Sequence, residues 1–94
     1  MRYDGSVYKI KSNEVVAYTA TAGNSAAAAT GIIAVRVVTT TAAHVAIGNG
    51  VTATTSDALL PANDPASFKI FDGERVSVIQ NAAGGNAYVT FLTQ

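Results

Sequence analysis

The sequence predicts an all-β chain that folds as a small antiparallel β-sandwich. Short apolar and β-branched runs recur along it, separated by Gly, Asn, Asp and Pro at the ~8–12 residue spacing of such folds. No apolar pattern of helical period lasts for about three turns. Residues 68–80 join two β-prone runs through Asp72-Gly73, the strongest short-range hairpin signal. Because a lone hairpin is marginal in water, we expect about seven or eight short strands in all.

Composition indicates a surface that meets other proteins. The chain has 94 residues, enough for one domain, and only 13% of them are charged, against about 25% in an average domain. Its formal net charge is zero and its few basic residues are scattered, which argues against nucleic acid as a partner. Cysteine is absent, so no disulfide framework or thiolate site is expected. No run approaches the ~20 apolar residues of a membrane span, and the start is not a secretory signal.

The first third divides into an arm and the start of the sandwich. We expect residues 1–11 to form an N-terminal arm with a first short strand, and residues 12–94 to form a single β-sandwich domain. Ser12-Asn13 is a turn signal, and residues 14–21 should be the next strand. The alanine-rich residues 25–30 are interpreted as extended and not helical, because helices below ~12 residues are marginal and Gly31 follows at once.

The remaining two-thirds supply the other strands. Residues 32–41 read as a strand buried on both faces, and residues 43–47 as the next one. Residues 51–56 are Thr-rich and should be extended. Pro61 and Pro65 bracket a surface loop, since Pro cannot sit in a central strand. After the expected hairpin, residues 87–93 would complete a three-stranded meander.

Each candidate for chemistry has a better structural interpretation. Residues 48–53 match the dinucleotide-binding pattern G-x-G-x-x-G/A formally, but no helix-forming segment follows, so we interpret them as a turn. His44, the single histidine, should pack or hydrogen-bond within its strand. Asp57 and Asp64 should cap backbone amides, with a calcium site near Asp64 as the alternative. The Tyr and Phe side chains are spread over separate strands, so core plus interface is favoured over a stacking platform.

The order of several segments resembles small head decoration, or cement, proteins of tailed phages and prophages. These segments cover roughly the last two-thirds of the chain: Val35-Arg36-Val37-Val38, Ala43-His44-Val45-Ala46-Ile47-Gly48, Thr52-Ala53-Thr54, Asp57-Ala58-Leu59-Leu60-Pro61-Ala62, Gly73-Glu74-Arg75-Val76-Ser77-Val78-Ile79-Gln80 and Val89-Thr90. The resemblance implies a jelly-roll-like sandwich on the capsid exterior, often trimeric, with no catalytic residues and no cofactor.

From this resemblance we expect a non-catalytic protein that is made in the host cytoplasm and joins the virion. Its partners would be the major capsid protein and further copies of itself, as a homotrimer, with neither nucleic acid nor membrane involved. We expect capsid or subunit contacts from the arm and from the small-residue segment, at these positions: Arg2, Tyr3, Tyr8, Lys9, Lys11, Ala26, Ala27 and Ala28.

Two other functions remain open at this stage. A glycan-binding jelly-roll, or an accessory module of a tail or fibre, would present a groove lined by Tyr or Phe with Asn and Asp. An enzyme would need a cleft in which acidic residues cluster with His44.

Overall fold

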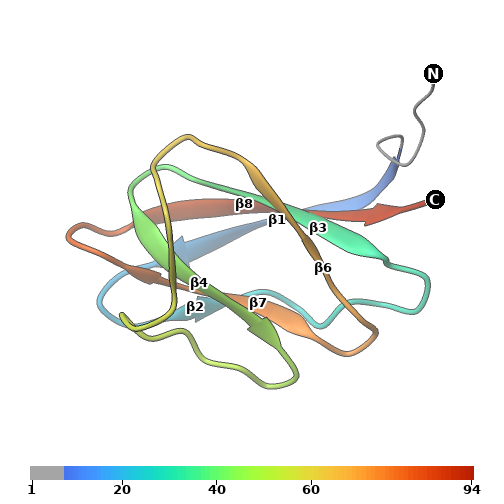
Figure 1. The fold of residues 1–94 in the computed structure, drawn as a ribbon, viewed down its shortest axis with the longest axis horizontal. Coiled ribbons are helices and arrows are strands. Elements are labelled where there is room, and N and C mark those ends of the chain that lie inside the picture. Colours follow the sequence, from blue (N-terminus) through green and yellow to red (C-terminus); the bar gives the residue numbers. More distant parts are fainter. Residues whose placement is uncertain (1–7) are drawn as a thin grey trace.

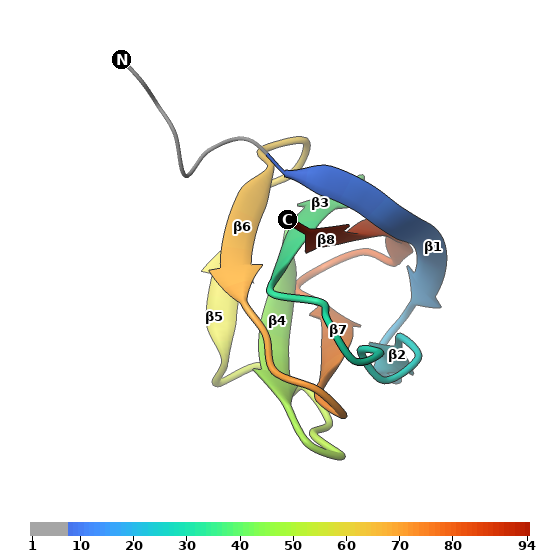
Figure 2. The ribbon, with the colours of Figure 1, turned by 90° about the vertical axis from the view of Figure 1, so that its right-hand side faces the viewer.

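The computed structural model describes residues 8–94. These residues form two four-stranded antiparallel sheets. The first sheet has the order β1-β8-β3-β6 and the second β2-β7-β4-β5 (Figures 1 and 2). The strands are β1 Lys9–Tyr18, β2 Gly23–Asn24, β3 Ala34–Thr39, β4 Ala43–Gly48, β5 Ala58–Leu60, β6 Ala66–Lys69, β7 Arg75–Gln80 and β8 Gly85–Thr93. The predicted all-β sandwich is confirmed. None of the described residues forms a helix that could span a bilayer.

The strand order is that of a jelly roll, in which eight strands form two packed sheets. Figure 2 shows each layer as a row of four strands, with the chain passing back and forth between the rows. Of the strands adjacent in sequence, only β4 and β5 pair with each other. The first strand instead pairs with the last, so that Lys9 lies opposite Thr93 and Tyr18 opposite Gly85.

The hairpin and meander predicted for residues 68–93 are wrong. Asp72-Gly73 does form a turn, in which Gly73 has a φ of 84° and the Glu74 amide donates to the Phe71 carbonyl oxygen at 3.1 Å. However, β6 enters the turn from the first sheet and β7 leaves it in the second. The apolar side chains of both strands face the same core from opposite layers. The two strands therefore separate after the turn and do not pair with each other.

One strand, β1, replaces the two strands and the turn expected between residues 6 and 21. The register against β8 shifts between Ile10 and Ser12, which is a β-bulge. A bulge adds a residue to one strand and bends it without ending the pairing. The polar Ser12-Asn13 pair therefore marks an irregularity within a strand.

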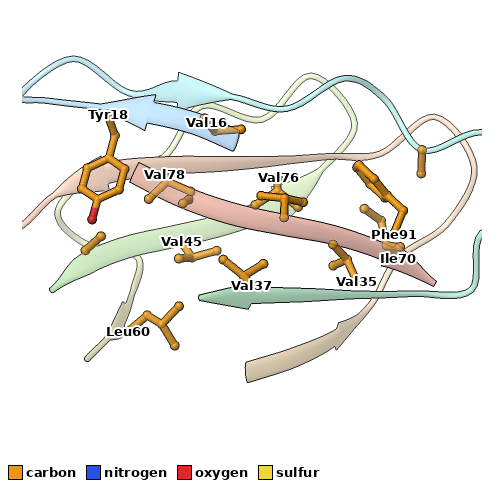
Figure 3. Close-up of a cluster of buried hydrophobic side chains, with 14 of the residues drawn as sticks. Val16, Tyr18, Val35, Val37, Val45, Leu60, Ile70, Val76, Val78 and Phe91 are labelled. Carbon is orange, nitrogen blue, oxygen red and sulfur yellow. The ribbon is translucent and has the colours of Figure 1, made fainter. Parts of the chain in front are cut away.

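The core lies between the two sheets and draws valines from both. Figure 3 shows the cluster, which includes Val35 and Val37 of β3 and Val76 and Val78 of β7, all fully buried. Alternate residues of each strand supply these side chains, as expected for half-buried strands. Thr39 is also fully buried, and its hydroxyl has no hydrogen-bond partner among the described residues.

Tyr18 fastens one end of the sandwich. Its hydroxyl donates to the Thr41 carbonyl oxygen at 2.9 Å and accepts from the Thr41 amide at 3.2 Å, which joins β1 to the turn between β3 and β4. Gly85 sits directly against this contact. A Cβ atom there would lie 2.8 Å from the Tyr18 hydroxyl oxygen, so the site needs glycine.

The alanine-rich segment is extended, as predicted, and runs beside β7. The Ala28 amide donates to the Glu74 carbonyl oxygen at 2.7 Å, and the Gly73 amide donates back to the Ala28 carbonyl oxygen at 2.9 Å. The Glu14 carboxylate accepts from the Ala26 amide at 3.1 Å. These bonds tie the segment to β1 and to the start of β7, and they place it along the edge of the second sheet.

Candidate docking surface

Among residues 8–94, no segment covers the outer face of the first sheet, which mixes apolar and polar side chains. Its strands place their outward residues in cross-strand rows, which run Ile10–Leu92–Ala34–Lys69, Asn13–Thr90–Arg36–Ser67 and Val15–Tyr88–Val38. Three large apolar side chains in these rows are well exposed: Ile10 by 71%, Val15 by 54% and Tyr88 by 42%. The polar row of Asn13 and Arg36 separates Ile10 from the neighbouring pair Val15 and Tyr88. Single exposed apolar residues are ordinary, but several large ones on one sheet face are typical of a surface that meets a partner.

A groove of about 790 Å³ continues this face at the end of the sandwich where β8 finishes, the end that Figure 2 faces. β6 ends there at Lys69, and the residues after it turn away from β3 toward the second sheet. Its walls are mostly apolar and its few polar groups lie on β6 and just beyond: Tyr8, Ile32, Ile33, Ala34, Ser67, Phe68, Lys69, Ile70, Phe71, Asp72 and Leu92. The volume lies within the range of ligand-binding clefts.

Charge on this side of the molecule is one-sided. The outward rows of the first sheet contain the two cations Arg36 and Lys69 and no carboxylate. The Lys69 ammonium lies 5.2 Å from the centre of the Phe71 ring, a cation–π contact at the groove. Asp72 is the one acidic residue that lines the groove. The cations of this face therefore lie in two places, Arg36 in its middle row and Lys69 at the groove.

The outer face of the second sheet is covered by residues 49–57, the yellow-green segment that follows β4 in Figure 1. The Ala53 amide donates to the Ser77 hydroxyl at 2.7 Å, and the Arg75 Nε donates to the Val51 carbonyl oxygen at 2.9 Å. The Ser77 hydroxyl donates in turn to Asn24 Oδ1 at 2.6 Å. Residues 51–56, which the sequence predicted as extended, form no strand because their polar groups bond to the side chains beneath them.

His44 belongs to this covered face. It is buried on β4, its Nδ1 lies 2.9 Å from the Asp57 carbonyl oxygen, and its Nε2 lies 3.1 Å from Asn81 Oδ1. The Asp57 carbonyl oxygen can only accept, so Nδ1 carries a hydrogen and donates this hydrogen bond. The predicted structural role of His44 within its strand is confirmed.

The acidic residues have separate structural roles. The Asp57 carboxylate accepts from the Thr54 amide at 2.7 Å, as predicted for a backbone cap. The Glu74 carboxylate accepts from the Phe71 amide at 2.8 Å. Among residues 8–94, no three Asp, Glu or His side chains gather as a possible metal site. Gly50, with a φ of 67°, turns the chain after β4, as the turn interpretation of residues 48–53 predicted.

The residues expected to make contacts fall in different places. Tyr8 lines the groove, and Lys9 and Lys11 are exposed on β1. Ala26 and Ala27 are exposed beside β7, whereas Ala28 is a core residue, so its assignment as a contact is corrected. Arg2 and Tyr3 lie outside the described residues.

The groove itself was missed at the sequence level. It is assembled from residues that lie far apart in the chain, and no local pattern marks Ile33, Phe71 and Leu92 as neighbours. No protein-family model, curated protein or solved structure matches this chain.

Proposed function

We propose that this protein is a phage cement protein that binds the outside of the capsid and stabilises contacts between major capsid protein subunits. The outer face of the first sheet, which none of residues 8–94 covers, carries this proposal. A small chain with a covered second sheet leaves this face for a partner, and its exposed residues Ile10, Val15 and Tyr88 are the kind of side chain that interfaces bury. The resemblance to decoration proteins supplies the identity of the partner.

The mechanism would be mass action. A protein that binds the assembled shell and not its dissociated subunits stabilises the shell in proportion to RT ln(1 + [L]/Kd). Repetition of the contact at symmetry-related sites adds avidity when the protein is itself oligomeric. No reaction is required, and the two nitrogens of His44 are already occupied in holding its own strand.

The test is binding of a face variant to capsids of the phage that encodes this chain, depleted of the protein. Tyr88→Asp places a charge in the middle of the outer face, and we expect its affinity to fall at least about tenfold, the loss typical of a central interface residue. Thr55→Asp adds the same charge at an exposed position of the segment that covers the second sheet, and should bind normally. Equal binding of the two variants would remove this face from the capsid contact.

The N-terminal arm is tested separately. Removing residues 1–7 leaves β1, which begins at Lys9, intact. We expect reduced occupancy on the capsid, because termini commonly order on binding. Full occupancy would exclude those residues as an anchor, without affecting the proposal for the sheet face.

The groove favours one alternative, a glycan-binding module of a tail or fibre. Tyr8, Phe71 and Asp72 line it, which matches the aromatic and acidic lining such a module needs. A glycan array probed with the native protein and with Phe71→Ala would decide: a ligand that only the native protein binds supports the alternative.

A further inference from the structure

One exposed apolar side chain lies apart from all the others. Of the seven large apolar side chains that are exposed among the described residues, six lie on the first sheet or at its groove: Tyr8, Ile10, Val15, Ile33, Phe71 and Tyr88. The seventh is Leu59, exposed by 56%, on the edge strand β5 of the second sheet. It points outward beside His44, its cross-strand neighbour.

Carboxylates accompany Leu59, whereas a cation borders the groove. Asp57 precedes β5, and Asp64 is exposed in the loop that follows it. At the groove, Lys69 lies over the ring of Phe71, which is exposed by 60%. The exposed Leu59, with an acidic residue on either side of it in the sequence, is complementary to an apolar groove with an ammonium group at its border, and Asp72 is the only acidic residue among those that line the groove.

We propose that Leu59 of one copy of this chain inserts into the groove of a second copy, with Lys69 of the second copy facing Asp57 or Asp64 of the first. This inference rests on the self-association that forms part of the proposed function, and it names the surfaces that associate. The two surfaces lie on different sheets of the molecule, so the contact is heterologous. Heterologous contacts join subunits head to tail, into rings when the rotation closes.

A symmetric face-to-face dimer fits the charges less well. The outer face of the first sheet carries Arg36 and Lys69 without a carboxylate, so two such faces would bring like charges together. The head-to-tail contact avoids this repulsion. It also uses only the groove of the first sheet, which Ile10, Val15 and Tyr88 do not line, so these three residues stay free to meet the capsid.

The test needs only the purified protein, with its mass in solution measured by light scattering over a concentration series. Leu59→Asp removes the inserted side chain and Phe71→Asp adds a charge to the groove. Both residues are more than half exposed, so both variants should fold, which thermal unfolding verifies. We expect the native protein to be oligomeric and each variant alone to be monomeric.

Mixing the two variants gives the decisive result. Leu59→Asp retains an intact groove and Phe71→Asp an intact Leu59, so together they can form one native contact and no more. We expect a 1:1 heterodimer that does not grow, while Thr55→Asp, as the control, stays oligomeric like the native protein.

Three outcomes would overturn the inference: a monomeric native protein, an oligomeric single variant, or a mixture that stays monomeric. The capsid contact proposed above is tested separately by Tyr88→Asp. A failure here is therefore distinguishable from a failure of capsid binding.

Discussion

Arg75 and Arg36 both point outward from central strands, one on each sheet, yet only Arg75 is incorporated into the protein's own structure. Arg75 donates to the Val51 carbonyl oxygen at 2.9 Å and lies beneath residues 49–57, whereas Arg36 is exposed on the outer face of the first sheet. One sheet thus has its outer face covered within the chain, by a segment joined through side-chain hydrogen bonds. The other sheet leaves Ile10, Val15 and Tyr88 exposed. Matched substitutions on the two faces should therefore differ in their effect on stability.

The largest difference in unfolding free energy between the two faces should follow from placing a carboxylate on each. Ala53 belongs to the covering segment and is only 2% exposed against the sheet, so Ala53→Asp buries an unpaired charge and should cost about 3–5 kcal/mol of unfolding free energy. Ala17→Asp, at an exposed outward position of β1, should cost no more than about 1 kcal/mol. Urea unfolding of both variants measures this, and equal losses would mean that the two faces do not differ.

Removing one hydroxyl group from each face should give a smaller difference in unfolding free energy. Ser77→Ala leaves the Ala53 amide and Asn24 without their partner inside the covered face, and should cost about 1–3 kcal/mol. Thr90→Ala removes an exposed bond to Asn13 on the bare face and should cost less than about 1 kcal/mol. Chemical denaturation resolves the two, and a larger loss for Thr90→Ala would contradict the comparison.

The two arginines give the third comparison. Arg75→Gln loses the bonds to the covering segment and should lower the unfolding free energy by about 1 kcal/mol. Arg36→Gln should change it by less than about 0.5 kcal/mol, as is usual for an exposed side chain. Thermal unfolding of the two variants, which carry the same net charge, provides the measurement, and the reverse order would refute the assignment of the faces.

The smallest effect on stability belongs to the most exposed residue of the bare face. Ile10→Thr should alter the unfolding free energy by less than about 0.5 kcal/mol, because Ile10 is largely solvated and Thr also suits a strand. The same variant should bind capsids more weakly. A variant that is destabilised and binds normally would show that Ile10 serves the fold and not a partner.

The sequence was informative where a signal is local. The β-branched run of residues 32–41 and the alternation of residues 75–80 reveal strands, and Asp72-Gly73 reveals a turn. The prediction that residues 32–41 are buried on both faces was wrong, because Arg36 is exposed on the outer face of β3. Pairing was not predictable, because the turn joins strands of different sheets and a short-range signal does not tell which partner a strand will meet. Residues 51–56 resemble a strand in composition, but hydrogen bonds to Ser77 and Arg75, over twenty positions away, hold them in another conformation.

The candidate surface was only partly accessible to the same reasoning. Low charge indicated a surface that meets other proteins, and Tyr8, Lys9 and Lys11 were expected near a contact. Ala28 failed because a small residue suits a tight core as well as an interface, and composition does not separate the two. Ile33 precedes β3 and Phe71 follows β6, so the two residues line one groove only in the folded chain.

The pairing of the first strand with the last also determines how the chain reaches its native state. Pairing of β1 with β8 requires closure of a loop that contains nearly all of the described chain. Of the described strands that follow each other in the sequence, only β4 and β5 pair and can form a local ladder. Proteins dominated by such distant contacts refold on a timescale of about milliseconds to seconds, far more slowly than helical bundles of equal size. During synthesis on the ribosome, β1 therefore has to wait for residues 85–93 to emerge before it finds its neighbour.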